Sequence, residues 1–173
     1  MGITIHYRFM VRDKDAVLRV LKAVREIATK IKMKIIEDTE TCLTIHPHPN
    51  CETLCLDFKK WKEVKEAKER DYCREAMRDF EGVIKDENFV CSSFTKTQYA
   101  GCRTHILVAE ILRNVAARCT LAYVGDEAGY YETGDFQKTE ANFDASSRMI
   151  RDMADKLKEA FGSENVYCAI DNT

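Results

Sequence analysis

The chain of 173 residues has few prolines and glycines, no excess of one charge and no long apolar run. Two prolines and seven glycines leave little room for linkers or low-complexity segments. A formal net charge of -2 gives no general attraction to nucleic acid or to an anionic membrane surface. No apolar run approaches the roughly 20 residues that a membrane helix needs. We therefore expect a single domain, residues 1–173, with no nucleic-acid and no membrane partner.

Signals of secretion and of common cysteine sites are also absent. The N-terminus alternates as a strand does and has no apolar signal-peptide segment, so we expect a cytoplasmic protein. The sequence contains eight cysteines, but no Cys-x-x-Cys pair supports a zinc ribbon or a thioredoxin-like site. We expect most of these thiols to be reduced and to pack as small buried hydrophobes.

Hydrophobic periodicity predicts several strands and helices. Apolar residues alternate over residues 3–11, which predicts a half-buried strand. Over residues 17–31 they recur at helical spacing, and this is the clearest helix signal in the chain. Apolar and polar residues also alternate over residues 41–46 and 53–58, which predicts a hairpin of two strands.

The second half of the chain gives weaker signals. The predicted elements are a helical stretch within 59–87, a strand at 89–97, a buried helix at 105–116, a hairpin of strands 120–124 and 129–132, a helix at 149–161 and a strand at 166–170. Because hairpins disfavour an all-parallel sheet, we expect an α+β fold with a mostly antiparallel sheet and three to four helices packed on it.

Two histidines in the predicted hairpin tip form the first candidate site. Pro47 and Pro49 restrain His46 and His48 to extended conformations, and a two-residue step would point both rings to one side. Neutral imidazoles held side by side suit a divalent metal such as zinc, with Cys51, Glu52 or a carboxylate of the acidic segment 126–135 as a further ligand. The alternative is a proline-rich turn that merely exposes two histidines. We expect this tip to lie near residues 88–135.

The second candidate is the segment 96–104, where a strand runs into a glycine-bearing loop and a helix N-terminus. Free backbone N–H groups and the helix dipole favour an anion there, and Lys96 and Arg103 add positive charge. Gln98 and Gly101 would complete the binding loop. The pattern is neither a Walker loop nor Gly-x-Gly-x-x-Gly. The alternative is a strand-to-helix turn that Gly101 eases.

The third candidate combines His105 with the acidic segment 126–135. His105 can act as a general acid or base because its unperturbed pKa is near neutrality, and Asp126 and Glu132 could activate water or bind a metal. Tyr131 would contact a substrate from the same segment. The alternatives are a hydrogen-bonded core histidine and a solvated acidic rim.

Two cysteines are candidate nucleophiles. Cys51 lies in the histidine-rich tip, and Cys102 lies at a predicted helix N-terminus, which would lower its pKa. With eight cysteines in the chain, such proximity to a histidine is weak support.

Four segments together resemble those of a family of uncharacterised small bacterial and archaeal proteins of about this length. They are Ile3-Thr-Ile-His-Tyr-Arg8, His46-Pro-His-Pro-Asn-Cys-Glu-Thr-Leu54, Lys96-Thr-Gln-Tyr-Ala-Gly101 and Asp126-Glu-Ala-Gly-Tyr-Tyr-Glu-Thr-Gly-Asp135. The resemblance spans most of the chain and implies a small soluble protein. It implies no particular activity, substrate or cofactor.

The sequence thus leaves two functional hypotheses open. One is metal-assisted hydrolysis of a small anionic substrate, with His46 and His48 holding the metal and Lys96 binding the anion. The other is a non-catalytic module that binds a small anionic ligand or a protein partner through the same loops. The sequence does not decide whether the chain is an enzyme, and it does not give the oligomeric state.

Overall fold

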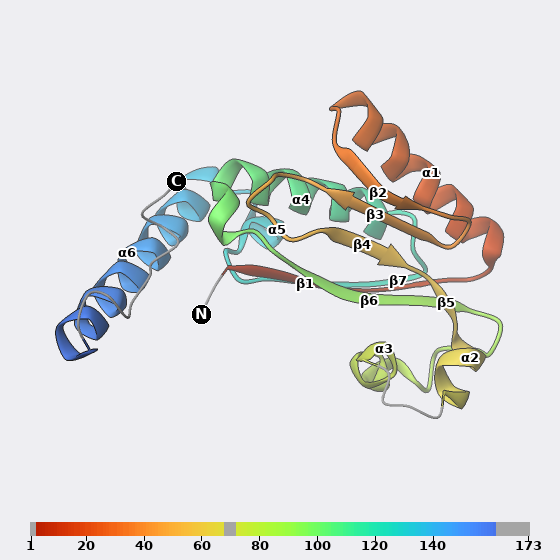
Figure 1. Cartoon of the computed structure of the whole chain (residues 1–173). Helices are drawn as coiled ribbons and strands as arrows, with labels where there is room; N and C mark the ends of the chain where they lie inside the picture. Colours follow the sequence, from red (N-terminus) through yellow and green to blue (C-terminus); the bar gives the residue numbers. More distant parts are fainter. Residues whose placement is uncertain (1–2, 68–71, 162–173) are drawn as a thin grey trace.

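The computed structural model describes residues 3–67 and 72–161 and shows an α+β fold built on two antiparallel sheets (Figure 1). The predicted fold class is confirmed, although the strands form two sheets instead of one. Within the described residues, no helix has both the length and the apolarity needed to cross a membrane.

The larger sheet has four strands in the order β5 (Lys59–Lys60), β6 (Phe89–Lys96), β1 (Thr4–Val11) and β7 (Leu121–Asp126). The central strand β1 pairs antiparallel with both β6 and β7. Its alternation is the one expected from the sequence: Ile5, Tyr7 and Phe9 are fully buried on one face, while His6 is exposed on the other. This sheet brings the ends of β6 and β7 together beside the first residues of the chain.

The smaller sheet contains β2 (Lys34–Asp38), β3 (Cys42–His46) and β4 (Leu54–Asp57), and β3–β4 is the predicted hairpin. Tyr7 links the two sheets, because its hydroxyl donates to the Cys55 carbonyl at 2.9 Å and accepts from the Cys55 amide at 3.2 Å. Burial raises the pKa of Tyr7, so the phenol stays a neutral donor at all ordinary pH values.

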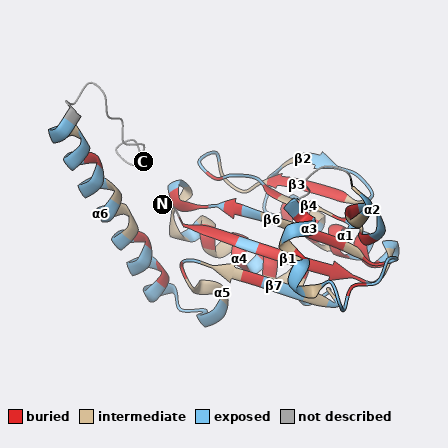
Figure 2. Cartoon of the chain, turned by 90° about the horizontal axis from the view of Figure 1, so that it is seen from below, coloured by how far each residue is buried: buried red, intermediate tan, exposed pale blue. Residues whose placement is uncertain are grey.

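Two long helices cover the main core. They are α1 (Lys14–Lys30) and α4 (Gly101–Ala116), which pack on the inner face of the larger sheet and against the smaller one (Figure 1). Asp13 caps α1 by accepting from the Ala16 amide at 2.9 Å. The core they enclose is almost wholly aliphatic and aromatic, and Figure 2 shows the buried residues concentrated there.

The segment predicted as one weak helix forms three short pieces instead. These are α2 (Trp61–Glu66), α3 (Tyr72–Ala76) and a 3₁₀ helix (Arg78–Phe80). They cover part of the outer face of the larger sheet, where Trp61 and Met77 pack with Met10 and Val90. A second, smaller core therefore lies on the far side of that sheet from α1 and α4.

The predicted strand at 129–132 is wrong, because this segment is the helical turn α5 (Tyr130–Thr133). Gly129 and Gly134 both adopt left-handed backbone conformations, with φ of 78° and 66°, and they bracket the turn. The last helix, α6 (Phe136–Phe161), begins much earlier than predicted and extends away from the sheets (Figures 1 and 2). The strand predicted at 166–170 lies outside the described residues.

Candidate functional site

His105 and Asp126 form a fully buried pair between α4 and the end of β7. The Nε2 atom of His105 lies 2.9 Å from Oδ1 of Asp126, and neither side chain has exposed surface. The N–H direction at Nε2 does not align with that oxygen, so this contact is a close polar approach and not a hydrogen bond. On the other side of the ring, Nδ1 lies 2.8 Å from the Thr97 hydroxyl, and Phe143 of α6 packs edge-on against the ring.

Asp126 also organises the turn that follows it. Its Oδ1 accepts from the Ala128 amide at 2.8 Å and its Oδ2 accepts from the Tyr131 amide at 2.9 Å. Burial alone would raise the pKa of Asp126, but the contact with His105 and these two amides outweigh it and lower that pKa. Asp126 is therefore a carboxylate near neutral pH that ties β7, α4 and α5 together.

The burial of this pair limits its chemistry. The structure does bring His105 and Asp126 together, as the third candidate site required, but no solvent-exposed surface remains for a substrate. Glu132 is exposed and does not join them. Tyr131 is held by Arg113, which lies over its ring and donates to its carbonyl oxygen at 2.6 Å. In this arrangement the pair and Tyr131 hold the fold together.

The segment 96–104 is a strand-to-helix turn with a short 3₁₀ helix (Gln98–Ala100) inside it. Gln98 is buried, and its Oε1 accepts from the Ile3 amide at 3.1 Å. Gly101 adopts φ of 81° at the first residue of α4, which favours glycine there. Lys96 and Arg103 are exposed. The turn thus uses Gln98 and Gly101 structurally and leaves only the two cations available to a ligand.

Neither candidate cysteine has the properties of an activated thiol. Burial, with the nearby carboxylates of Glu140 and Asp144, raises the pKa of Cys102 in spite of its position at a helix N-terminus. Burial also raises the pKa of Cys51 to about 12. The expectation of a lowered pKa at Cys102 is wrong because desolvation and like charge outweigh the helix dipole.

The tip of the β3–β4 hairpin does lie near the 88–135 segment. The Glu52 amide donates to the Lys96 carbonyl at 3.1 Å, and the Lys96 amide donates to Oε2 of Glu52 at 3.1 Å. This reciprocal pair fixes the loop against the end of β6. It also occupies the carboxylate that was expected to complete a metal site.

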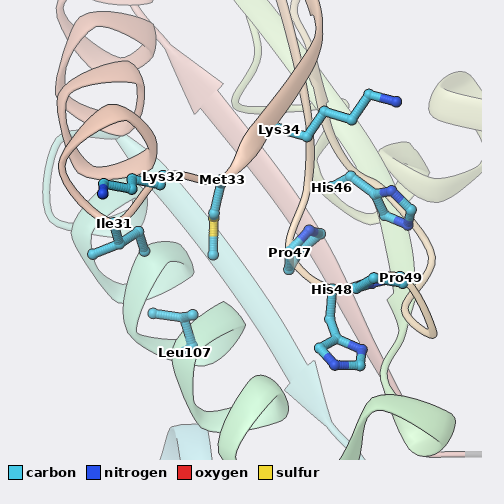
Figure 3. Close-up of a pocket in the computed structure, with 9 residues that line it drawn as sticks. All are labelled: Ile31, Lys32, Met33, Lys34, His46, Pro47, His48, Pro49 and Leu107. Atoms are coloured by element: carbon cyan, nitrogen blue, oxygen red, sulfur yellow. The ribbon is translucent and has the colours of Figure 1, made fainter.

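The rings of His46 and His48 line the same hollow but point in different directions, so they are not held side by side as expected (Figure 3). The Nε2 atom of His46 donates to the Cys51 carbonyl at 2.9 Å. His48 opens a turn closed by the Cys51 amide, and its Nδ1 accepts from the Asn50 amide at 3.1 Å. No group of three His, Cys, Asp or Glu residues within 3–67 and 72–161 could hold a metal ion. The zinc site stays a prediction from the sequence.

A shallow hollow of about 530 Å³ lies beside this tip, between the end of α1, the start of β2 and the second turn of α4 (Figure 3). Figure 3 shows Met33 between Ile31 and Leu107 on one side and Pro47 and His48 on the other. The apolar side chains form the walls. Lys32 and Lys34 extend to opposite rims.

All titratable residues that line the hollow are basic. Its titratable lining residues are Lys32, Lys34, His46 and His48, and no carboxylate of the described chain lines it. The neutral His48 ring must carry its proton on Nε2, because Nδ1 accepts from the Asn50 amide. The apolar walls are therefore accompanied by one N–H donor and two ammonium groups.

Lys32 has an unusual backbone. Its φ of 58° makes it the one non-glycine residue with positive φ among the residues that the structure describes. The chain there closes α1, with the Lys32 amide donating to the Thr29 carbonyl at 3.2 Å and the Met33 amide donating to the Ala28 carbonyl at 2.8 Å. Glycine is the usual residue at such a helix end, because a side chain in the left-handed conformation lowers the stability of the fold. A lysine at this position therefore suggests a role for its side chain.

Neither Lys32 nor Lys34 was predicted as a site residue, because Lys32 follows a predicted helix, where a cation is ordinary. The one available signal was the absence of glycine where α1 must end. No protein family, curated protein or solved structure matches this chain.

Proposed function

We propose that the protein binds a small organic anion with an apolar body in the hollow beside the β3–β4 tip. The observation behind this proposal is that all four titratable lining residues are lysines or histidines around apolar walls. An apolar group would pack on Met33 and Leu107, and the anion would meet Nε2–H of His48 and one lysine ammonium. The sequence had suggested an anionic ligand, but placed it at Lys96.

The volume agrees with this class of ligand. Small-molecule sites of about 300–1,000 Å³ are typical, and the hollow of about 530 Å³ lies in that range. The hollow is open to solvent, since Ile31 is 43% exposed. We therefore propose binding or carrying of the ligand, and we assign no reaction to it.

Phenyl phosphate is a suitable probe, with inorganic phosphate and benzyl alcohol as the anion-only and apolar-only comparisons. We expect saturable binding of phenyl phosphate in heteronuclear NMR titrations, with shifts at Met33, His48 and Leu107. Both comparison probes should bind at least about tenfold more weakly, because each makes half of the contacts. Equal affinity for all three probes, or shifts confined to other parts of the chain, would refute the proposal.

Lys32→Gly is the sharpest variant. It removes the ammonium group and relieves the left-handed strain, so the free energy of unfolding should stay the same or rise by up to about 1 kcal/mol. Binding of phenyl phosphate should nevertheless weaken by at least about threefold. Lys30→Ser is the control, because Lys30 lies in the last turn of α1, two residues before Lys32, but does not line the hollow.

A further inference from the structure

A row of apolar side chains on α6 has no partner in the described chain. Ala145, Met149, Met153 and Leu157 are spaced four residues apart and are all exposed, with Met149 and Met153 more than half exposed. The buried residues Phe143 and Ala154 lie on another side of the helix. The apolar row therefore lies apart from the contact of Phe143 with Ile3 and Ala128, along a helix of about 39 Å.

A row of charges lies next to the apolar row. Asp144, Arg148, Asp152 and Lys156 also follow at four-residue spacing, and their signs alternate. All four are exposed. None forms an ion pair within 4.0 Å with another described residue. A hollow of about 510 Å³ runs along this face and is lined by both rows.

The order of these charges is antisymmetric about residue 150. If a second, identical helix lies antiparallel across this point, Arg148 faces Asp152 and Lys156 faces Asp144, and each contact occurs twice. A parallel copy would instead place each charge opposite itself. Rows of residues at i±4 spacing are the ridges that interlock in the commonest class of helix crossing. The apolar rows would then pack together at the centre of the crossing.

We propose that two copies of the chain associate through antiparallel packing of α6, with Met149 and Met153 at the centre and the alternating charges as the flanking contacts. This interface does not depend on the proposed ligand hollow. One helix face is smaller than the area of a standard stable interface, so the dimer should be weak and should dissociate on dilution. High salt should weaken it further.

Sedimentation velocity of the full-length protein over a wide concentration range tests this proposal. Arg148→Asp places a carboxylate opposite Asp152 of the second copy, and Asp152→Arg places a guanidinium opposite Arg148 of the second copy. Each variant alone should show a dissociation constant at least about tenfold above that of the wild type. An equimolar mixture should restore association to within about threefold of the wild type, because opposite charges then face each other again.

Arg151→Asp is the matched control. It makes the same charge change three residues from Arg148, on the side of α6 opposite the apolar row, so the dissociation constant should not change. A wild-type protein that stays monomeric at every concentration would overturn the proposal. Equal weakening by Arg151→Asp, or a mixture that stays monomeric, would also overturn it.

Discussion

Replacing Asp126 by asparagine should destabilise the protein strongly, because the carboxylate has three buried partners. Its two oxygens accept from the Ala128 and Tyr131 amides and lie against His105. Asparagine has the same shape but only one acceptor oxygen. One backbone amide would then face an NH₂ group, and the His105 ring would lose its contact with a carboxylate.

The expected loss can be set from the cost of breaking a buried pair. Leaving a buried polar group without its partner costs about 1–3 kcal/mol, and two such groups are left here, so we expect a loss of about 3–5 kcal/mol. Domains are stable by about 5–15 kcal/mol, so a large part of the total would be lost. For a chain of this size, about 1 kcal/mol corresponds to about 2–4 °C, and Tm should fall by roughly 6–20 °C.

Thermal and urea unfolding, followed by circular dichroism at pH 7, would measure this effect. The pH dependence gives a second readout. The pKa of Asp126 is lowered in the folded protein, so its stabilisation is complete above the unfolded-state pKa of about 3.9 and is lost as pH falls through the folded-state value. Asp126→Asn should therefore lose less stability than the wild type on acidification.

Glu132→Gln is the control, because this exposed carboxylate lies six residues away in the same segment. Its free energy of unfolding should change by less than about 0.5 kcal/mol. Two results would show that the buried pair does not hold β7 and α4 together. One is that Asp126→Asn changes the free energy of unfolding as little as Glu132→Gln does. The other is that Asp126→Asn loses as much stability in acid as the wild type does.

Three further measurements test the packing. Burial raises the pKa of Cys51 and of Cys119 to about 12, so at pH 8 these thiols should react with a thiol reagent about a thousand times more slowly than in urea, and equal rates would contradict this. Trp61, the one tryptophan, is 1% exposed, so its fluorescence should resist iodide quenching until the protein unfolds; ready quenching in the folded protein would contradict the second core. Leu54→Ala should cost about 2–5 kcal/mol, whereas Leu18→Ala, at a site 41% exposed, should cost far less; equal losses would contradict the burial of β4.

The strongest sequence patterns predicted the fold correctly. The alternation of residues 3–11 and the helical spacing of 17–31 correspond to β1 and α1, and the two runs around the proline-rich tip pair as β3 and β4. The segment 129–132 was misread because Tyr130 and Tyr131 suit a strand by composition. Two left-handed glycines and the Asp126 carboxylate stabilise a helical turn, and these specific local contacts are not contained in strand propensity.

The candidate sites were less predictable because they depend on contacts between distant segments. His105 and Asp126 could be chosen as separate candidates, but their burial depends on packing between distant segments, such as that of Phe143 of α6 against the His105 ring. His46 and His48 lost their common direction because local hydrogen bonds at Asn50 and Cys51 close a turn between them and the returning strand. Short-range restraint by proline could not reveal those bonds.

The helix α4 connects the buried pair and the hollow. Residues two positions apart in a helix point in nearly opposite directions, so His105 faces Asp126 while Leu107 reaches the hollow. The first turns of α4 have no side-chain cap, and the contacts of His105 with Thr97 and Asp126 fix this end of the helix. The buried pair therefore positions one wall of the proposed binding site without touching a ligand, which assigns it a structural role there.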